Sequence, residues 1–477
     1  MTLTLKHIKD ATQAYLFQGD LKTIIRGISI DSRAIKKGQL FIAIKGERFD
    51  GHNFICDVIQ KGVRAVLISE DNKKNILKKI LPLDHSKLAI LVVKDTTQAL
   101  GQIAGFYRRQ YRIPVIAVTG SAGKTTTKEM IASVLSKRYN VLRNLKTENN
   151  HFGVPLTLLK LCPSHHMVVL ELGTNHPGEI AYLSQIAKPT VAVFTNIGES
   201  HLEGLKTVRG VFEEKFQMLN NTSHRGTVIF NEDDPYLKSI YESHTPQKKI
   251  GYSVVEKTFY QAEDISVKNN QQLEFKVRGQ RILLKTPAQH NVHNALAAII
   301  CGEMFKVSFR NIQKALKNFS FSDHRQAIEE HEGLWILDDT YNANPISFLS
   351  AIETLNSLRV KGKKVLVCAD MLELGARSKI LHQEMAKKIH QTDIDWVLTI
   401  GDEAREISQT LAKLNGHRVS TFSFSSLKIL HQKLRDVCEP GDAVLVKGSR
   451  GMKMERTIEF LTEFCPMRQN SPVGPTD

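Results

Sequence analysis

Residues 115–127 of this chain are Val115-Ile-Ala-Val-Thr-Gly-Ser-Ala-Gly-Lys-Thr-Thr-Thr127. The apolar stretch from Ile113 to Val118 predicts a buried strand. A glycine loop follows it, and residues 128–137 then have the pattern of a helix. A loop of this kind, together with a helix N-terminus, presents backbone amides to an anion.

The loop contains the residue types that hold a nucleoside triphosphate. The amine of Lys124 can reach the outer phosphates, and the Thr125 hydroxyl can hold a magnesium ion. The spacing is shorter than the full Walker pattern, which would need a glycine at Val118. An ordinary glycine-rich turn is the alternative, but the order of strand, loop, Lys-Thr and helix favours nucleotide binding. We therefore expect ATP contacts from Gly120, Ser121, Ala122, Gly123, Lys124, Thr125 and Thr126.

Length and composition indicate a multidomain globular protein. About three domains are expected from 477 residues, of which 42% are hydrophobic and 24% charged. No apolar run is long enough to cross a bilayer, so we expect no membrane insertion. The N-terminus lacks the apolar segment of a signal peptide. The six cysteines are scattered without a Cys-x-x-Cys pair, which favours reduced thiols and a cytoplasmic location.

The net charge of +16 raises the question of a nucleic-acid partner. The basic residues are spread along the chain, and no RNA- or DNA-binding motif accompanies them. The charge also suits several anionic small molecules. We therefore expect no nucleic acid.

Strand and helix patterns divide the chain into three α/β blocks. In the second block, apolar runs at 167–172 and 191–195 predict a parallel sheet covered by helices on both faces. The third block repeats the alternation without a Gly-x-Gly-x-x-Gly motif, so no dinucleotide is indicated. Residues 467–477 are expected to be a disordered tail. Other expected strands are 28–30, 40–44, 65–68, 88–93, 334–337, 364–368, 396–400 and 443–446, with helices at 97–109 and 290–304 and a β-rich excursion at 261–285.

Candidate site residues follow the strands of the second block. In open α/β sheets, ligands bind beyond the carboxyl ends of the strands. Glu171 is there either a magnesium ligand or a capping or solvent-facing carboxylate, and oxygens beside phosphates favour magnesium. His201 is a candidate ligand for a second metal, with a structural histidine as the alternative. Lys215 by itself indicates only a solvated helix face.

Polar loops also follow the predicted strands of the third block. Each is ordinary turn chemistry by itself. Together, on one sheet edge, they indicate a second ligand surface. They are Asp338–Pro345, Ala369–Gly375, Gly401–Glu403 and Lys447–Arg450.

These residues give the chain a resemblance to the Mur ligase family of bacterial cell-wall synthesis. The resemblance covers nearly the whole chain. The motif Tyr341-Asn-Ala-Asn-Pro345 favours the branch that adds D-alanyl-D-alanine to UDP-N-acetylmuramoyl-tripeptide. The other motifs that carry the resemblance are Asp31-Ser-Arg33, Phe49-Asp-Gly-His52, 119–129, 148–155, Glu171-Leu-Gly173, Gly178-Glu-Ile180, 195–198 with His201, 290–298 and Val446-Lys-Gly-Ser-Arg450.

The resemblance implies an ATP-dependent amide ligase that works through an acyl phosphate. Its pathway would be cytoplasmic peptidoglycan precursor synthesis, and hence cell wall biogenesis, cell shape, cell division and the cell cycle. The implied domains are a small UDP-sugar-binding α/β domain (1–112), a central P-loop ATP-binding domain (113–320) and a C-terminal Rossmann-like domain (321–477). The implied ligands are ATP, magnesium, the UDP-sugar tripeptide, with lysine or diaminopimelate as its third residue, and D-alanyl-D-alanine. A monomer is expected.

The resemblance also implies roles for individual residues. Lys215 corresponds to a lysine that the family carbamylates, and the new carboxylate would support a second magnesium ion. His324 stands where relatives often have a glycine. The implied catalytic residues are Lys124, Glu171, His201 and Lys215, and the metal ligands Thr125, Glu171, His201 and carbamylated Lys215. Further nucleotide contacts are Asn291, Asn294, Arg325 and Asp339, the UDP-substrate residues Asp31, Ser32, Arg33, Asn149 and Asn150, and the dipeptide or closure residues Tyr341, Asn342, Asn344, Lys447, Ser449 and Arg450.

Other functions remain alternatives. A ligase for the third amino acid usually carries an Asp-Asn-Pro-Arg motif in its last domain, and this chain has none. A folate polyglutamylating relative would not have the first-block Asp-Ser-Arg and Asp-Gly-His motifs. A P-loop switch would need no ligation substrates, and a basic RNA-associated protein would bind RNA in a salt-sensitive manner.

Overall fold

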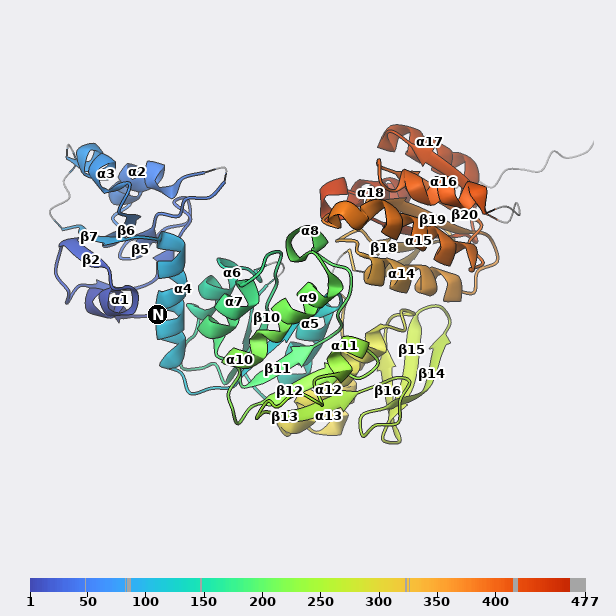
Figure 1. Ribbon diagram of the computed structural model, residues 1–477, viewed down its shortest axis with the longest axis horizontal. Helices are drawn as coiled ribbons and strands as arrows, with labels where there is room; N and C mark the ends of the chain where they lie inside the picture. The colour runs from blue at the N-terminus through green and yellow to red at the C-terminus, as the bar shows by residue number, and fades with distance from the viewer. Residues whose placement is uncertain are drawn as a thin grey trace, which may run out of the picture.

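The computed structural model describes residues 1–47, 49–81, 83, 87–145, 148–321, 324–325, 327–414 and 419–463. It confirms an α/β protein with three large sheets that follow one another along the chain (Figure 1). The tail expected from residue 467 lies outside the described residues. In the part of the chain that is described, no helix combines the length and apolar character needed to span a bilayer.

The N-terminal lobe contains a five-stranded sheet in the order β2-β7-β6-β5-β4. β2 is antiparallel to β7, and the other neighbours are parallel. Alternate side chains enter separate cores, with Leu40 in one and Phe41 in the other, because strand side chains alternate between faces. The elements are β1 (Leu3–Thr4), α1 (Leu5–Thr12), β2 (Tyr15–Gln18), β3 (Ile24–Ile25), β4 (Ile28–Ser29), β5 (Leu40–Ile42), η1 (Gly51–Phe54), α2 (Ile55–Gln60), β6 (Ala65–Ser69), α3 (Lys73–Ile80), β7 (Ala89–Val93) and α4 (Thr96–Arg109).

The central lobe contains six parallel strands in the order β13-β12-β11-β8-β10-β9. Ile116 packs in the core that includes α5 and α12, and Ala117 in the core that includes α4 and α7. The three-stranded antiparallel sheet β14-β15-β16 is the β-rich excursion that the sequence predicts. The elements are β8 (Val115–Thr119), α5 (Lys124–Leu135), β9 (Val141–Arg143), α6 (Gly153–Leu158), β10 (Met167–Glu171), α7 (Glu179–Ala187), β11 (Val191–Phe194), α8 (Leu202–Leu205), α9 (Val208–Phe216), α10 (Met218–Asn221), β12 (Thr227–Asn231), α11 (Pro235–Lys238), β13 (Lys248–Tyr252), β14 (Ala262–Lys268), β15 (Gln272–Val277), β16 (Gln280–Leu284), α12 (Asn291–Met304) and α13 (Phe309–Lys317).

The C-terminal lobe contains a six-stranded sheet in the order β17-β18-β22-β19-β20-β21. Only β17 runs antiparallel to its neighbour among the described strands of this sheet. The elements are β17 (Ala327–His331), β18 (Leu334–Asp339), α14 (Pro345–Ser357), β19 (Lys364–Ala369), η2 (Gly375–Arg377), α15 (Ser378–His390), β20 (Trp396–Ile400), α16 (Arg405–Lys413), β21 (Ser420–Phe424), α17 (Leu427–Val437), β22 (Ala443–Lys447), η3 (Arg450–Met452) and α18 (Glu455–Glu463).

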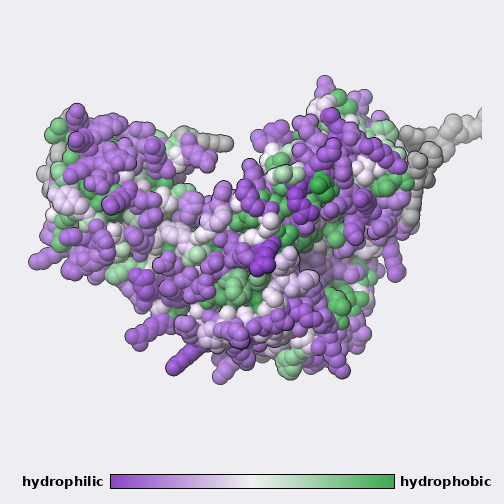
Figure 2. Space-filling view, viewed as in Figure 1, coloured by the Kyte–Doolittle hydropathy of each residue, from purple (hydrophilic) through white to green (hydrophobic). Residues whose placement is uncertain are grey.

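Strand register places the ligand-binding edge of the central sheet. β8 pairs with β10 so that Val118 lies opposite Glu171, and with β11 so that Thr119 lies opposite Phe194. The carboxyl ends of these three buried strands therefore meet at one edge. In Figure 1 the C-terminal lobe lies above this side of the central lobe, and Figure 2 shows the molecular surface hollowed between the two outer lobes.

Candidate functional site

The phosphate loop has a backbone that needs its glycines. Gly120 and Gly123 have φ angles of +153° and +77°. A Cβ atom at Gly120 would lie 1.9 Å from Thr195 Oγ1, and one at Gly123 would lie 2.7 Å from Asn294 Oδ1. Larger residues are therefore excluded by contact as well as by backbone conformation. α5 begins at Lys124, four residues earlier than the sequence pattern predicts, so the amides of its first turn adjoin the loop.

The loop after β11 holds the phosphate loop in place. The Asn196 side-chain oxygen accepts from the Ala122 amide at 2.7 Å, and its backbone carbonyl accepts from the Ser121 amide at 2.9 Å. The Thr195 hydroxyl donates to the Ala122 carbonyl at 2.6 Å. These contacts prearrange the loop before a ligand arrives.

Lys124 folds back over the loop that precedes it. Its Nζ donates to the Gly120 carbonyl at 2.7 Å. Burial lowers the pKa of Lys124, the charge of Arg325 lowers it further, and Glu171 opposes both effects. A triphosphate would add to the negative charge that Glu171 supplies near this amine.

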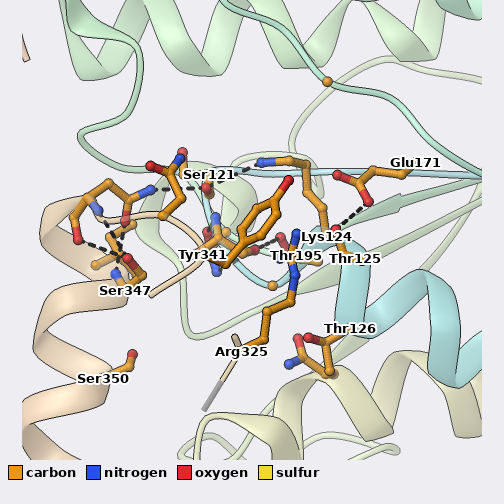
Figure 3. Close-up of a pocket in the computed structure, with 18 of the residues that line it drawn as sticks. Ser121, Lys124, Thr125, Thr126, Glu171, Thr195, Arg325, Tyr341, Ser347 and Ser350 are labelled. Atoms are coloured by element: carbon orange, nitrogen blue, oxygen red, sulfur yellow. Dashed lines mark hydrogen bonds between the residues drawn. The ribbon is translucent and has the colours of Figure 1, made fainter. Parts of the chain in front are cut away.

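Glu171 and Thr125 form a hydroxyl–carboxylate pair at the edge of the sheet (Figure 3). The Thr125 hydroxyl donates to Glu171 Oε2 at 2.5 Å, and the Asn149 amide donates to Oε1 at 2.8 Å. Glu171 is buried, so the solvent-facing alternative is wrong. Hydroxyl and carboxylate oxygens beside a phosphate loop suit a magnesium ion, which keeps several waters and few protein ligands.

Lys215 is buried in α9, which contradicts its interpretation as part of a solvated helix face. Its neighbour Glu214 caps α7, because its carboxylate accepts from the amides of Gly178 at 2.7 Å and Ile180 at 2.8 Å. Burial, and next the charge of Lys124, hold the pKa of Lys215 well below 10.5. The amine is therefore biased toward its neutral form, which is the form that reacts with carbon dioxide.

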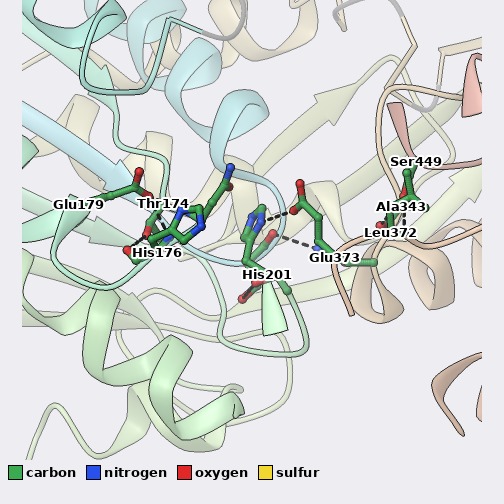
Figure 4. A network of polar contacts seen from close by, with 12 residues as sticks. Thr174, His176, Glu179, His201, Ala343, Leu372, Glu373 and Ser449 are labelled. Atoms are coloured by element: carbon green, nitrogen blue, oxygen red, sulfur yellow. Dashed lines mark hydrogen bonds and ion pairs between the residues drawn. The ribbon is translucent and has the colours of Figure 1, made fainter. Parts of the chain in front are cut away.

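His201 joins the central and C-terminal lobes (Figure 4). Its Nδ1 lies 2.6 Å from Glu373 Oε2, and the Glu203 amide donates to the Glu373 carbonyl at 3.1 Å. Burial lowers the pKa of His201 although Glu373 raises it, and the hydrogen bond from His201 lowers the pKa of Glu373. In the tautomer in which Nδ1 donates to the Glu373 carboxylate, Nε2 is the ring nitrogen that can bind a metal.

The start of α12 forms another wall of the site. Asn291 and Asn294 are buried, and the Asn294 amide donates to Asn291 Oδ1 at 2.9 Å. The Thr127 hydroxyl donates to Asn294 Oδ1 at 2.8 Å, which joins α12 to α5. Nδ1 of the adjacent His290 is buried without a partner among the described residues.

The C-terminal lobe supplies the opposite wall. The Arg325 guanidinium lies 3.7 Å from the centre of the Tyr341 ring, and Figure 3 shows both side chains beside Lys124 and Thr125. His324 has φ +63°, a conformation that favours glycine, and its Nδ1 lies 2.7 Å from Asp338 Oδ2. The left-handed backbone is compatible with the glycine that the family resemblance implies at this position.

The motif loop after β18 reaches the phosphate loop. The Asn344 amide donates to the Ser121 carbonyl at 3.2 Å, while its side-chain oxygen caps α14. Behind the loop, the buried Lys447 amine donates to Asp339 Oδ2 at 2.5 Å, and the Ser449 hydroxyl donates to the Ala343 carbonyl at 3.3 Å. Lys447 and Ser449 therefore support the loop from behind.

One cavity of about 830 Å³ gathers most of the predicted residues. Gly120 and the predicted residues of the N-terminal lobe are not among the residues that line it. Lys215, Lys447 and Ser449 are buried and do not line it either, and Arg450 is exposed, with its guanidinium 3.9 Å from Glu455. The predicted residues that do line it are Ser121, Ala122, Gly123, Lys124, Thr125, Thr126, Asn149, Asn150, Glu171, His201, Asn291, Asn294, Arg325, Asp339, Tyr341, Asn342 and Asn344.

Asp31, Ser32 and Arg33 belong to the N-terminal lobe and do not line this cavity. Arg33 donates to both carboxylate oxygens of Asp31 at 2.9 Å, and this contact lowers the pKa of Asp31 to about 2. Lys61 donates to the Ser32 carbonyl at 2.8 Å. The three residues form one polar turn after β4.

Sequence reasoning missed several residues of the cavity wall. Glu373 belongs to one of the predicted polar loops, but its hydrogen bond with His201 was not predicted. Ser347 and Ser350 on α14 also line the cavity, and no motif marks them. Among the described residues, no group of three or more His, Cys, Asp or Glu side chains has a metal-binding arrangement. A metal here would therefore need the hydroxyl of Thr125, phosphate oxygens or a modified side chain.

Comparison with known proteins gives the chain a family. Residues 24–108 match the model of the Mur ligase family catalytic domain, 118–302 the Mur ligase middle domain, and 292–450 the Mur ligase glutamate ligase domain. The UDP-N-acetylmuramoyl-tripeptide–D-alanyl-D-alanine ligase of Bacillus subtilis (strain 168) is 36% identical, over 96% of this chain and 98% of its own. The chain belongs to the Mur ligase family.

Further Mur ligases support this relationship. The ligase of the same name from Escherichia coli (strain K12) is 33% identical, over 97% of this chain and 99% of its own. A crystal structure of MurF from Acinetobacter baumannii aligns with a TM-score of 0.86 at 31% identity, over 97% of this chain and 99% of that one. The MurF ligase from Thermotoga maritima in complex with ADP aligns with a TM-score of 0.79 at 27% identity, over 92% and 97%.

Proposed function

We propose that this chain is an ATP-dependent ligase that joins D-alanyl-D-alanine to UDP-N-acetylmuramoyl-tripeptide. The observation that carries the proposal is the cavity of about 830 Å³ between a phosphate loop with its Thr125–Glu171 pair and the Tyr341-Asn-Ala-Asn-Pro345 loop. Two relatives that match over nearly the full length of both chains bear the name of this ligase. The Thermotoga maritima relative holds ADP, which supports ATP as the nucleotide.

The chemistry requires activation of a carboxylate. The carboxylate of the tripeptide attacks the γ-phosphorus of ATP, the β–γ bond breaks, and ADP leaves. The acyl phosphate is then attacked by the neutral amine of D-alanyl-D-alanine. The tetrahedral intermediate expels phosphate, and the amine loses its proton as the amide forms. Both steps crowd negative charge, so positive groups must lie beside the phosphoryl oxygens.

Lys124, Arg325 and the first turn of α5 supply that positive potential. Thr125 and Glu171 would hold a magnesium ion, which would neutralise phosphate charge when bound. Asn291, Asn294 and Asp339 would contact the nucleotide at the other walls of the cavity. Contacts from both lobes would exclude water, which would otherwise hydrolyse the acyl phosphate.

A carbamate on Lys215 is the finer part of the proposal. The depressed pKa supplies the neutral amine that carbamylation needs. A carbamate would replace a buried positive charge by a negative one, which suits a second magnesium ion with His201 as a further ligand. Intact mass after incubation with bicarbonate would show the added carboxyl group.

The three lobes have proposed roles in substrate binding. Residues 1–112 would hold the UDP-sugar, with Asp31, Ser32 and Arg33 near the nucleotide and Asn149 and Asn150 on the central side. Residues 113–320 would bind ATP, and residues 321–477 would close over both and receive the dipeptide, with Tyr341, Asn342 and Asn344 at the cavity. We propose a cytoplasmic location, in agreement with the free cysteines among the described residues. We also propose that the chain acts as a monomer.

A product assay tests the proposal. ATP, the UDP-sugar tripeptide and D-alanyl-D-alanine should yield the pentapeptide product by mass spectrometry, and phosphate release should need all three. Lys124→Ala should make no product, whereas Lys137→Ala, at an exposed lysine just beyond α5, should act as wild type. Phosphate release without the peptide substrates would instead support the P-loop switch.

A further inference from the structure

A second cavity, of about 560 Å³, lies at the end of the central sheet away from the phosphate loop. Pro114, Val191 and Thr227 line it, and they stand at the amino ends of β8, β11 and β12. The phosphate loop follows the carboxyl end of β8, so the two cavities lie at opposite ends of the parallel strands. The first cavity and its chemistry therefore do not explain this one.

Arginines give the second cavity its charge. Arg108, Arg112 and Arg225 line it, and none of the described residues that line it is an aspartate or glutamate. Arg112 and Arg225 are exposed, whereas Arg108 is only 6% exposed. The lining therefore carries three positive charges and no carboxylate.

Arg108 is only partly satisfied by the protein. Its two terminal nitrogens donate to the carbonyls of Tyr111 at 2.6 Å and Ile113 at 3.0 Å. Its Nε is buried and has no partner among the described residues. Burial lowers the pKa of Arg108, because its charge meets only neutral carbonyls. Burying a guanidinium charge that is offset only by neutral carbonyls is costly, so an anion in the adjacent cavity would offset part of that cost.

We propose that this second cavity binds a phosphate-type oxyanion through Arg108, Arg112 and Arg225. A guanidinium donates paired hydrogen bonds that match the geometry of phosphate oxygens. A doubly charged phosphate balances three arginines better than a singly charged carboxylate does. Tyr111 and Phe305 also line the cavity, so the phosphate is either free or carried by a ring-bearing phosphomonoester.

The bound anion would tie the end of α4 to the amino end of the central sheet. Residues 110–114 connect α4, which packs against α1 of the N-terminal lobe and against α6 and α7 of the central lobe, to β8. Arg108 lies at the end of α4, Arg112 lies within this connection, and Arg225 precedes β12. The anion would therefore link α4 and the connecting segment to the start of β12.

Calorimetric titration tests the proposal with the full-length chain. A magnesium complex of a non-hydrolysable ATP analogue is kept saturating, so that phosphate cannot occupy the phosphate loop. The probes are inorganic phosphate and phenyl phosphate. The Arg112→Gln/Arg225→Gln variant changes two exposed side chains, and Arg310→Gln/Lys314→Gln on α13 removes the same charge elsewhere in the central lobe.

We expect the wild type to bind the probes and the Arg112→Gln/Arg225→Gln variant to bind them about tenfold more weakly or worse, because two charged hydrogen-bonding groups are lost. The α13 variant should bind as wild type does. Tighter binding of phenyl phosphate would identify a phosphomonoester, and equal binding would identify free phosphate. Absence of heat with the wild type, or equal affinity in all three proteins, would overturn the proposal.

Discussion

The Lys215 amine is buried, and the positive charge of Lys124 lies close enough to lower its pKa. Between the two pKa values, the Lys215 amine holds a proton in the unfolded chain and loses it in the folded protein. The free energy of unfolding of unmodified protein therefore rises with pH between the depressed folded pKa and 10.5. The proposed carbamate would need an amine at a position where an apolar side chain would be more stable, which is a trade-off common at active sites.

We predict that Lys215→Met will melt at a higher temperature than unmodified wild type at pH 7, with a difference that shrinks toward pH 10. Its ligase rate should fall by at least about 100-fold, because it can carry no carbamate. Calorimetry on protein prepared without bicarbonate gives the first result, and the product assay gives the second. Lys137→Met, at an exposed position, should change neither. Normal turnover by Lys215→Met would contradict the carbamate.

The Glu171 carboxylate accepts a hydrogen bond from the Thr125 hydroxyl at the proposed magnesium site. Glu171→Gln keeps the shape of the side chain but removes the charge that favours a hard cation. We predict that the magnesium concentration for half-maximal activity will rise by at least about tenfold. A magnesium titration of the product assay measures this, with Glu213→Gln on the exposed side of α9 as the control. An unchanged magnesium requirement would remove Glu171 from the metal site.

Single residues were predicted from the sequence where their neighbours form a motif. Glu171 ends an apolar run, so its burial at a strand end could be anticipated. Lys215 follows two glutamates, and the pattern predicted a solvated helix face. The structure differs because Glu214 turns inward to cap α7, and Lys215 is buried with it. Long-range capping of this kind leaves no local sequence signal.

At the scale of elements, glycines begin two helices in the same backbone conformation. Gly123 has φ +77° and precedes α5, and Gly178 has φ +90° and precedes α7. A Cβ at Gly123 would meet Asn294 Oδ1 at 2.7 Å, whereas one at Gly178 would meet nothing within 4 Å. Substitutions at the two positions therefore distinguish the effect of backbone strain from the effect of distorting the phosphate loop.

We predict that Gly123→Ala and Gly178→Ala will each lose about 1–2 kcal/mol of stability from the left-handed backbone. Only Gly123→Ala should also lose ATP binding, because the loop and Asn294 must move apart. Denaturant unfolding and nucleotide titration measure the two effects. Equal nucleotide affinity in both variants would show that the loop tolerates the extra atom.

The buried strands could be predicted because their apolar runs are continuous. The expected strands in all three blocks correspond to β4 to β8, β10, β11, β18 to β20 and β22. The sequence did not single out β9, β12, β13, β17 and β21, which lie toward the edges of their sheets, where burial is less uniform. The predicted start of α5 was too late, because the sequence Lys-Thr-Thr-Thr is by itself typical of a loop. In the structure this segment is helical and is fixed by the adjoining sheet and by the hydrogen bond to Asn294.

At the scale of the whole molecule, hydrogen bonds at two places join the described parts of the central and C-terminal lobes. At the proposed active site, His201 and Glu203 contact Glu373, and Asn344 contacts Ser121. The other place lies apart from it, where the β14–β15 turn meets the end of α14. There the Asn270 amide donates to the Arg359 carbonyl at 2.6 Å, and the Arg359 amide donates to Asn270 Oδ1 at 2.9 Å. These two hydrogen bonds can be removed without changing any residue that lines the cavity.

We predict that Asn270→Ala will shift the molecule toward arrangements in which the C-terminal lobe is released. Each neutral hydrogen bond contributes about 1 kcal/mol, so losing two should favour release by about tenfold or more. Small-angle X-ray scattering should show a larger radius of gyration, and the concentration of substrate for half-maximal rate should rise while the affinity for ATP alone stays the same. Asn269→Ala is the matched control, since Asn269 has a similar φ of +51° but is exposed. An unchanged scattering profile in Asn270→Ala would mean that the active-site contacts alone hold the two lobes together.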